Sequence, residues 1–527
     1  ARRWRRYVHF PVMTQPILLD GDSLTADQVY RVAVEGTPVA LSDRGRERVA
    51  RARAAVVEVL RRGDVVYGVT TGFGKLSEVA IPPERLRDLQ VNLVRSHASG
   101  VGPLLPEREV RAMMLLRANV IAKGFSGARP ELIDLLAGML NAGISPEVPE
   151  QGSVGASGDL APLAHLACAL IGEGMVRRDG TRGVAADVLH AAGLRPVVLE
   201  PKEGITLING TQAHTAIAAL ALTDVLRLWR AAHVAGAMSL EGLLGTPVAF
   251  DARIQAARGQ VGQAESAALL RALLADSEIR ESHRTGDPRV QDAYALRCMP
   301  QVHGPARDAF AFAESVIGRE LNAATDNPLV LDGAEMVSGG NFHGQAVALA
   351  LDVMAIALAN LANIAERRID RVLHPDLNHG LPAFLARDAG VNSGFMMAQV
   401  TAAALASECK MLAHPASVDT IPTGGGKEDV VPMAMGAAWK LRRSVANVRN
   451  VLAIELMCAA QAVELRAPLT PAVRVGEAVA LVRRMVPPLD RDRALSADIA
   501  ALSDAIASGA FDAVAVGAPT ATASASR

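Results

Sequence analysis

The sequence predicts a mainly α-helical protein in which a long central helical bundle follows a loop-rich N-terminal domain. Apolar residues recur at steps of three and four along many segments, which is typical of helices that bury one face. Only 3% of the residues are aromatic, and segments that read as strands are few and short, such as 327–338. Close-packed helices with small contact residues fit this composition better than a β-sandwich of aromatic and β-branched pairs.

The helical periodicity identifies the individual elements. In chain order, the predicted helices cover 47–62, 106–123, 130–142, 160–175, 210–244, 304–322, 343–373, 395–413, 433–464 and 472–485. The helix over 343–373 is almost continuously apolar in its first half, but Asp352, Asn360 and Asn363 interrupt it. We therefore expect a buried core helix there rather than a membrane span.

Length and charge limit the domain organisation and the partners. A chain of 527 residues with 50% hydrophobic and 21% charged residues is long enough for about three folded domains. The formal net charge of -1 gives no basic excess for nucleic acid or anionic membrane as the main partner. A small neutral or zwitterionic ligand fits this balance.

We expect four segments along the chain. Residues 1–12 form a basic extension outside the core, with Met13 as the natural start, and 13–220 form the N-terminal domain. Residues 221–512 form the helical bundle domain, and 513–527 form a disordered tail of small polar residues. The apolar run after the basic residues is too short for a signal peptide.

The cysteines indicate a reducing compartment. Four cysteines are far apart in the sequence and form no CxxC pair, namely Cys168, Cys298, Cys409 and Cys458. Together with the absence of a signal peptide pattern, this predicts reduced thiols and a cytoplasmic location.

Polar loops between the helices are the expected places for function. They are rich in Gly, Asp, Asn and Pro and cover 67–78, 152–159, 284–301, 323–345 and 415–432. The loop 152–159 begins the string GSVGASGDLAP, which ends at residue 162. Its simplest interpretation is a glycine turn in which Ser157 or Asp159 caps a helix beginning near Leu160. A phosphate cradle is a second interpretation, but no GxGxxG or GxxxxGK[ST] pattern accompanies it.

A third interpretation of the string is chemical. In a tight bend, the nitrogen of Gly158 can attack the carbonyl carbon of Ala156. Loss of two waters, one with the Ala156 carbonyl oxygen and one with the Ser157 hydroxyl, then leaves a methylidene-imidazolone ring. Such a ring is an electrophile. Asp159 is placed to assist the dehydrations.

The string QGSVGASGDLAPLAHLA resembles the segment that forms this prosthetic group in the aromatic amino acid ammonia-lyases and aminomutases. The resemblance runs from about residue 17 to 485. It continues in order through YGVTTGFGKL, LVRSHASGVG, EGITLINGTQ, VQDAYALRC, TDNPLV, SGGNFHGQ and GVNSGFMMAQVTAAALASE. It implies a 4-methylidene-imidazol-5-one group formed autocatalytically from Ala156, Ser157 and Gly158, without a metal.

Two of the four tyrosines fall in the polar loops. The resemblance implies that Tyr67 accepts the β-proton of the substrate and that Tyr294 sits against the reacting centre. A tyrosine with a pKa near 10 is a poor base unless its surroundings favour the phenolate. Without the resemblance, both would read as hydrogen-bonded structural tyrosines.

Four further residues are expected to bind substrate. Arg297 offers a planar guanidinium for the substrate carboxylate, although a surface salt bridge is its default interpretation. Gln291 and Asn209 would ordinarily cap loops, and the resemblance places their amides near the ring. Phe342 is expected to form a wall of the site.

His97 and Glu428 indicate which amino acid is bound. Relatives that act on histidine carry Ser-His and Glu at these positions, whereas relatives that act on phenylalanine or tyrosine carry other residues there. The string TGGGKEDVVPM nevertheless departs from the usual pattern of the histidine-specific members at Lys427, Val430 and Pro432. Lys427 either pairs with Glu428 or points to solvent. The loop QDAYALR also lacks a frequent proline.

The resemblance implies conversion of L-histidine to urocanate and ammonia by a homotetramer whose active sites are shared between subunits. One alternative keeps the ring but acts on tyrosine or phenylalanine, as a lyase or as a 2,3-aminomutase. Another is a helical scaffold that has lost activity, although the intact Ala-Ser-Gly, the two tyrosines and Arg297 speak against it.

Overall fold

The computed structural model describes residues 15–331 and 335–517, which fall into two compact units. The first unit comprises the described residues within 1–220, 316–348 and 416–436. The second comprises the described residues within 221–315, 349–415 and 437–527. The predicted extension over 1–12 lies outside the described residues. Of the predicted tail over 513–527, residues 513–516 belong to a helix, α20 (Asp512–Val516), and residues 518–527 lie outside the described residues.

The first unit combines short helices with small sheets. Its helices are α1 (Ala26–Val34), α2 (Asp43–Arg62), α3 (Leu86–His97), α4 (Glu107–Ala122), α5 (Pro130–Asn141), α6 (Leu160–Leu170), α7 (Ala185–Ala191) and α8 (Glu203–Ile208). Its strands are β1 (Ile17–Leu19), β2 (Val39–Leu41), β3 (Val101–Leu104), β4 (Ile144–Pro146), β5 (Pro149–Gln151), β6 (Met175–Arg178), β7 (Thr181–Val184), β8 (Leu329–Val330) and β9 (Met336–Val337).

Among the described residues, each sheet has two or three strands. Strands β1 and β2 are parallel, and β3 pairs with β5 in antiparallel fashion. Strands β4, β6 and β7 form an antiparallel sheet, with Ser145 opposite Arg177 and Val176 opposite Gly183. Strands β8 and β9 pair inside the predicted strand segment 327–338, of which residues 332–334 lie outside the described residues.

Helix α4 forms the core of the first unit because it is buried on every side from Glu109 to Ala122. A helix that is apolar all round belongs in the interior. The buried stretch nevertheless includes Arg111, Arg117 and Asn119, whose side chains bond to other segments of the unit.

The second unit is helical. Its helices are α10 (Ala252–Arg258), α11 (Val261–Leu273), α12 (Glu278–Glu281), α13 (Tyr294–Arg297), α16 (Met396–Leu412), α18 (Val473–Arg483), α19 (Ser496–Ala507) and α20 (Asp512–Val516). Four longer helices have most of their length in this unit, namely α9 (Gln212–Gly242), α14 (Met299–Glu320), α15 (Gln345–Leu373) and α17 (Ala434–Glu464). The predicted mainly α-helical fold is confirmed.

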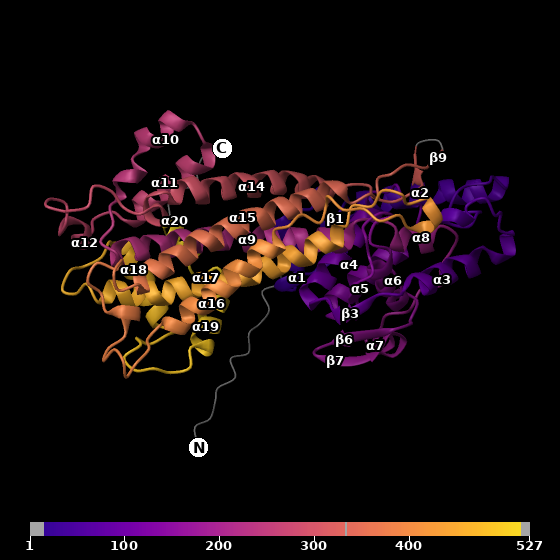
Figure 1. Ribbon diagram of the computed structural model, residues 1–527. Coiled ribbons are helices and arrows are strands. Elements are labelled where there is room, and N and C mark those ends of the chain that lie inside the picture. The colour runs from indigo at the N-terminus through magenta and orange to yellow at the C-terminus, as the bar shows by residue number, and fades with distance from the viewer. Residues whose placement is uncertain (1–14, 332–334, 518–527) are drawn as a thin grey trace, which may run out of the picture. The chain divides into compact units, whose positions relative to one another are not determined.

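Buried polar contacts tie the four long helices into a bundle, and Figure 1 shows them running alongside one another. Trp229 on α9 donates its indole N–H to the carbonyl of His303 on α14 at 2.8 Å. Arg368 on α15 and Glu455 on α17 form a buried ion pair at 2.5 Å, and Ser239 on α9 donates to the same carboxylate at 2.8 Å.

Helix α15 is long and apolar enough to cross a membrane by length and composition alone. However, 72% of its most apolar 18-residue window is buried inside the structure. This burial is what the sequence predicts for a core helix.

Two local predictions around α6 are wrong. The helix ends at Leu170 rather than near 175, because Gly172 and Gly174 adopt left-handed φ values of 85° and 76° and the chain then enters β6. In addition, the Asp159 side chain does not cap α6. It accepts the N–H groups of Ala213 and His214 at the start of α9 instead.

Candidate active site

The Ala156-Ser157-Gly158 segment lies in a bend between β5 and α6 and packs backbone to backbone on the turn between α8 and α9. Gly158 adopts φ of 74°, and a Cβ on it would lie 2.1 Å from the carbonyl oxygen of Gly210. The Asp159 N–H donates to that same oxygen at 2.7 Å. Only glycine fits this contact, and the neighbouring Ala156 is buried.

Asn209 in the α8–α9 turn contacts the bend directly. Its Nδ2 donates to the Ser157 carbonyl at 2.8 Å. Its Oδ1 is buried and has no hydrogen-bond partner among the described residues. An unsatisfied buried acceptor is costly in a protein interior, so this oxygen is available for a ligand or for water.

The fully buried Arg117 holds the α8–α9 turn from the α4 side. Its Nη1 donates to the carbonyls of Thr206 at 2.8 Å and Asn209 at 3.1 Å, and its Nη2 donates to the side-chain oxygen of Gln212. Burial lowers the pKa of Arg117 to about 10, while Asp326 and Asp159 oppose that shift. The guanidinium therefore stays charged near neutral pH and fixes the backbone that carries Asn209.

Glu428 faces the bend from a glycine hairpin. Ser157 Oγ donates to its Oε1 at 2.5 Å, and Thr423 Oγ1 donates to its Oε2 at 2.5 Å. Thr423 and Glu428 also form a β-bridge across the short 3-10 helix η6 (Gly424–Gly426), in which all three glycines have left-handed φ. The triple glycine thus permits the tight turn that aims Glu428 at Ser157.

Lys427 does not pair with Glu428. Among the described residues, neither a hydrogen bond nor an ion pair joins the two side chains, and the partners of the Glu428 carboxylate are the hydroxyl groups of Ser157 and Thr423. Of the two possibilities that the sequence leaves open for Lys427, pairing with this glutamate is excluded.

A cavity of about 700 Å³ opens over Ser157. It is lined by Tyr67, Gly72, Phe73, Gly74, Lys75, Leu76, Val79, Ile81, Leu89, Asn92, Leu93, Ser96, His97, Ser157, Leu160, Ile205, Asn209, Gly424 and Glu428. All of these residues belong to the first unit. An apolar wall with a few convergent polar groups, at this volume, is typical of a small-molecule site.

Tyr67 and His97 enter the cavity from different elements. The Tyr67 hydroxyl accepts the N–H of Gly74 at 3.4 Å, and its ring meets Phe73 edge to face at 6.3 Å. His97 is the last residue of α3, and its Nδ1 donates to the Leu93 carbonyl at 2.8 Å. Since a carbonyl can only accept, Nδ1 carries the proton and Nε2 is left as the acceptor of the neutral ring.

Gln291, Tyr294 and Arg297 belong to the second unit, on and just before α13. Tyr294 is 71% exposed, and the Arg297 guanidinium carbon lies 4.5 Å from the centre of its ring. Arg297 Nε has no hydrogen-bond partner among the described residues. Phe342 lies in the first unit, between β9 and α15, and is not among the residues that line the cavity.

The sequence analysis missed several residues that shape this site. Thr423 orients Glu428, Arg117 holds Asn209, and His214 and Ser153 bind Asp159. A signal existed for Arg117, since a charged residue in the middle of the apolar string MMLLRANVIA must find buried partners. The others depend on contacts between segments that are far apart in the chain.

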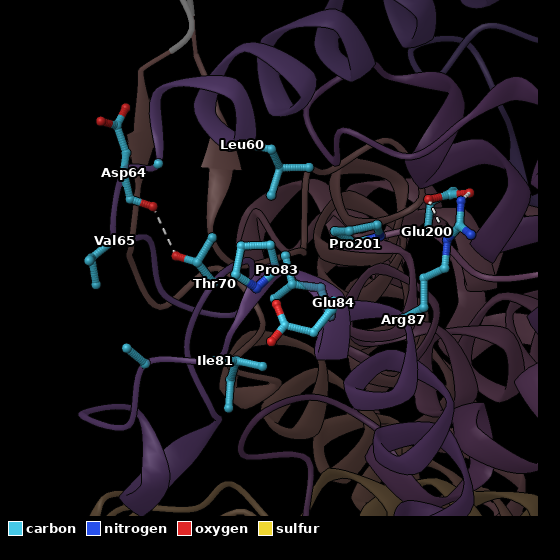
Figure 2. Close-up of a pocket in the computed structure, with 13 residues that line it drawn as sticks. Leu60, Asp64, Val65, Thr70, Ile81, Pro83, Glu84, Arg87, Glu200 and Pro201 are labelled. Atoms are coloured by element: carbon cyan, nitrogen blue, oxygen red, sulfur yellow. Dashed lines mark hydrogen bonds and ion pairs between the residues drawn. The ribbon is translucent and has the colours of Figure 1, made fainter.

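A second hollow of about 540 Å³ lies on the same unit (Figure 2). Arg87 and Glu200 form an ion pair at its edge at 2.7 Å, and Thr70 donates to the Asp64 carbonyl at 2.9 Å. It contains none of the predicted site residues, and only Ile81 lines both cavities. Among the described residues, no group of three or more His, Cys, Asp or Glu side chains could hold a metal ion.

Comparison with known proteins agrees with the motifs. A sequence model of the family described as aromatic amino acid lyase matches residues 24–484. The histidine ammonia-lyase of Anaeromyxobacter sp. (strain K) is 57% identical over 507 residues, covering 94% of this chain and 100% of that protein. The chain therefore belongs to the aromatic amino acid lyase family, which makes it a carbon–nitrogen lyase, and the resemblance inferred from the motifs is confirmed.

Solved structures show the same fold. The histidine ammonia-lyase from Trypanosoma cruzi superposes with a TM-score of 0.88 at 41% identity over 95% of each chain. The tyrosine aminomutase from Streptomyces globisporus gives a TM-score of 0.90 at 39% identity, covering 95% of this chain and 98% of that one. A histidine ammonia-lyase and a tyrosine aminomutase thus share this fold.

Proposed function

We propose that the protein is a histidine ammonia-lyase, which converts L-histidine to urocanate and ammonia. The observation that carries the proposal is the meeting of Ser157, Glu428 and His97 around one cavity. The curated relatives of the same description, 57% identical in the case of the Anaeromyxobacter enzyme, support the same reaction.

The residues of the bend fit the prosthetic group that this reaction needs. The Gly158 nitrogen bonds to the Ala156 carbonyl carbon, and that oxygen leaves as water with the N–H protons of Gly158 and Ser157. A second water takes the Ser157 hydroxyl and its Cα proton and leaves a Cα=Cβ double bond. The close fit of Gly158 on Gly210 and the Asn209 contact at the Ser157 carbonyl support such a bend. When formed, the ring supplies an electrophile that turns the substrate amine into a leaving group.

The side chains around the bend have separate tasks. Tyr67 removes the β-proton, and Tyr294 stands against the reacting centre. Arg297 binds the substrate carboxylate as a bidentate donor, while Gln291 and Asn209 donate hydrogen bonds to ring and substrate. Asp159 assists the dehydrations as a buried carboxylate beside Gly158.

His97 and Glu428 select the imidazole of histidine, and Phe342 forms part of the wall around the substrate. In the uncyclised chain Glu428 Oε1 accepts the Ser157 hydroxyl. Ring formation removes that hydroxyl as water, so it also frees the oxygen for the imidazole N–H of the substrate.

The alternative function is that of a lyase or 2,3-aminomutase that acts on tyrosine or phenylalanine. The similarity to a tyrosine aminomutase structure supports this alternative. The hydroxyl-bound carboxylate of Glu428 favours histidine, because a charged acceptor matches the imidazole N–H and is unfavourable beside an apolar phenyl ring.

The proposed enzyme is a cytoplasmic homotetramer in which each active site combines loops from three subunits. The exposure of Tyr294 is consistent with a residue that becomes engaged on assembly. Size-exclusion chromatography with light scattering tests the tetramer directly.

One assay separates the candidate activities. The protein is incubated with L-histidine, L-tyrosine and L-phenylalanine, the near-ultraviolet absorbance of the unsaturated product is followed, and β-amino acids are sought by chromatography. We expect urocanate from histidine and no product from Ser157→Ala. Turnover of tyrosine without turnover of histidine would overturn the substrate assignment.

A further inference from the structure

The side chain of His214 on α9 is fully buried beside the ring-forming bend, and no role in the proposed reaction uses it. Its Nδ1 lies 2.9 Å from Oδ1 and 2.8 Å from Oδ2 of Asp159, the residue that directly follows Gly158. Its Nε2 is buried and has no hydrogen-bond partner among the described residues. Because a carboxylate accepts hydrogen bonds, Nδ1 of His214 carries the proton and donates it to Asp159.

The side chain of Asp159 connects the two ends of the bend to the start of α9. Its carboxylate accepts the N–H groups of Ala213 at 2.8 Å and His214 at 3.0 Å, and the Ser153 hydroxyl at 2.9 Å. Ser153 lies at the other end of the bend and accepts the N–H of Gly155 at 3.1 Å. The Asp159 carboxylate therefore closes the bend from residue 153 to residue 159.

The charge on this buried carboxylate depends on its donors. Burial raises the pKa of Asp159, but the charge and hydrogen bonds of His214 and the hydroxyl of Ser153 outweigh it, so the pKa lies below its usual range. Without a hydrogen-bond donor such as His214, burial would favour the protonated form of the Asp159 carboxylate, and the carboxylate would no longer be fixed in one orientation.

The ring of His214 also supports the bend by packing. A Cβ on Gly344 would lie 2.7 Å from Cε1 and 2.8 Å from Nε2 of His214, so the imidazole rests directly on that glycine. The N–H of Gly344 donates in turn to the Gly155 carbonyl at 3.0 Å. His214 thus reaches the bend by two routes, through Asp159 at one end and through Gly344 at the other.

We propose that His214 is a positioning residue for ring maturation: by donating Nδ1–H to Asp159, it holds the bend in the shape from which Gly158 N attacks the Ala156 carbonyl. This inference rests on the proposed function, because it concerns how the prosthetic group of that function forms. His214 touches neither the reacting atoms nor the cavity. Its effect is on the rate of maturation rather than on the chemistry of the finished ring.

The test measures maturation in the full chain. Wild type and variants are made by cell-free synthesis, soluble protein is sampled over time, and the mass of the peptide containing residues 152–162 reports the loss of two waters. In His214→Ala we expect this loss to be about tenfold slower or more, as for removal of one hydrogen bond to a buried charge. His214→Phe, which keeps a ring but has no donor, replaces the alanine variant if that variant is insoluble.

A conservative variant separates positioning from mere structural support. His214→Asn places an amide N–H near the position of Nδ1 and is expected to restore most of the rate. Thr215→Val, a buried change one residue along α9, is the matched control and should mature at the wild-type rate. Melting temperatures are measured in parallel, because a purely structural role predicts lower stability in all His214 variants with unchanged maturation.

The outcomes distinguish this inference from the proposed function. Maturation of His214→Ala or His214→Phe at the wild-type rate, or equal slowness of His214→Asn and His214→Ala, overturns the role of His214 alone. An uncyclised peptide in the active wild-type protein overturns the proposed function itself.

Discussion

Single hydrogen bonds determine the orientation of Glu428 in this site. Two hydroxyl groups hold its carboxylate, from Ser157 on one side and Thr423 on the other. In the proposed mechanism Thr423 remains after ring formation, so it would keep the carboxylate oriented while the oxygen freed by Ser157 turns to the substrate. The neighbouring Lys427 plays no part in this arrangement.

Glu428→Gln is expected to lower kcat/KM for histidine by about 10- to 100-fold, because a neutral amide replaces a charged acceptor for the imidazole. Ring formation is expected to proceed, because Glu428→Gln leaves the Gly158 nitrogen, the Ala156 carbonyl and the Ser157 hydroxyl unchanged. Steady-state urocanate formation measures the effect, and the peptide mass reports the ring. Lys427→Gln is the control, with a change of less than about threefold. An equal loss in both variants would show that the loop, not the carboxylate, matters.

Residue identities in the site could be predicted to a useful extent, but their partners could not. Tyr67, His97, Ser157, Asn209 and Glu428 were candidates from the sequence, and they line one cavity. One interpretation of the string had Ser157 or Asp159 cap the helix that follows, yet the Asp159 carboxylate accepts the first N–H groups of α9. Which free helix terminus a carboxylate reaches depends on tertiary packing, and local sequence does not contain that information.

At the scale of elements, the turn between α8 and α9 is the surface against which the bend is formed. Gly210 has φ of 146°, and a Cβ there would lie 2.5 Å from Gln212 Oε1 and 2.6 Å from Arg117 Nη2. Arg117 is buried and fixed by its own hydrogen bonds, so it cannot yield.

Gly210→Ala is expected to destabilise the first unit by more than about 3 kcal/mol, because it combines backbone strain with a steric clash at a buried network. Gly180→Ala is the matched control: Gly180 also has positive φ, but open space surrounds its Cβ position, so the cost is about 1 kcal/mol. Denaturant unfolding measures both. Equal costs would contradict the close packing of the turn.

The positions of the elements were more predictable than their ends. The long helices follow from apolar periodicity that persists over many turns, as in α9 and α17. Helix ends depend on single residues, and the glycines after Leu170 stop α6 earlier than the apolar pattern indicates. The short strands have too few residues for a pattern of period two to be distinct.

At the scale of the whole molecule, the second unit contains two buried histidines that link its stability to pH. His233 and His303 pack edge to face at 4.6 Å, with the Arg368–Glu455 ion pair beside them. His233 Nδ1 donates to the Trp229 carbonyl, and its Nε2 accepts from Ser266. Burial lowers the pKa of His233 to about 3 and lowers that of His303 well below its ordinary value.

The sign of the pH effect follows from these shifts. Below pH 6.5 the unfolded chain binds protons at both histidines, whereas the folded chain does not. The free energy of unfolding is therefore unaffected by these histidines above pH 6.5 and decreases as the pH falls below it. The expected loss is about 1.4 kcal/mol per pH unit for each histidine. Melting temperatures between pH 7.5 and 5.5 measure this loss. In His303→Gln the loss of stability per pH unit should be about half that of the wild type, because only His233 then contributes. A flat profile in the wild type would contradict the buried neutral pair.

The proposed sharing of active sites predicts complementation between inactive variants. Ser157→Ala and Tyr294→Phe are each expected to be nearly inactive alone. In tetramers co-assembled from equal amounts, about a quarter of the sites would combine an intact Ser157 with an intact Tyr294 from another chain. Activity well above that of either variant is the expected result of a histidine assay. Co-assembly without recovery would contradict shared sites.

The central claim is that the backbone at Ala156-Ser157-Gly158 reacts with itself to make the electrophile that the enzyme uses. The most direct measurement is the mass of the peptide spanning residues 152–162, taken from a preparation whose turnover of histidine has just been measured. The account predicts a mass two waters below that of the encoded peptide in nearly all molecules. The unaltered mass in a preparation with full activity would contradict it.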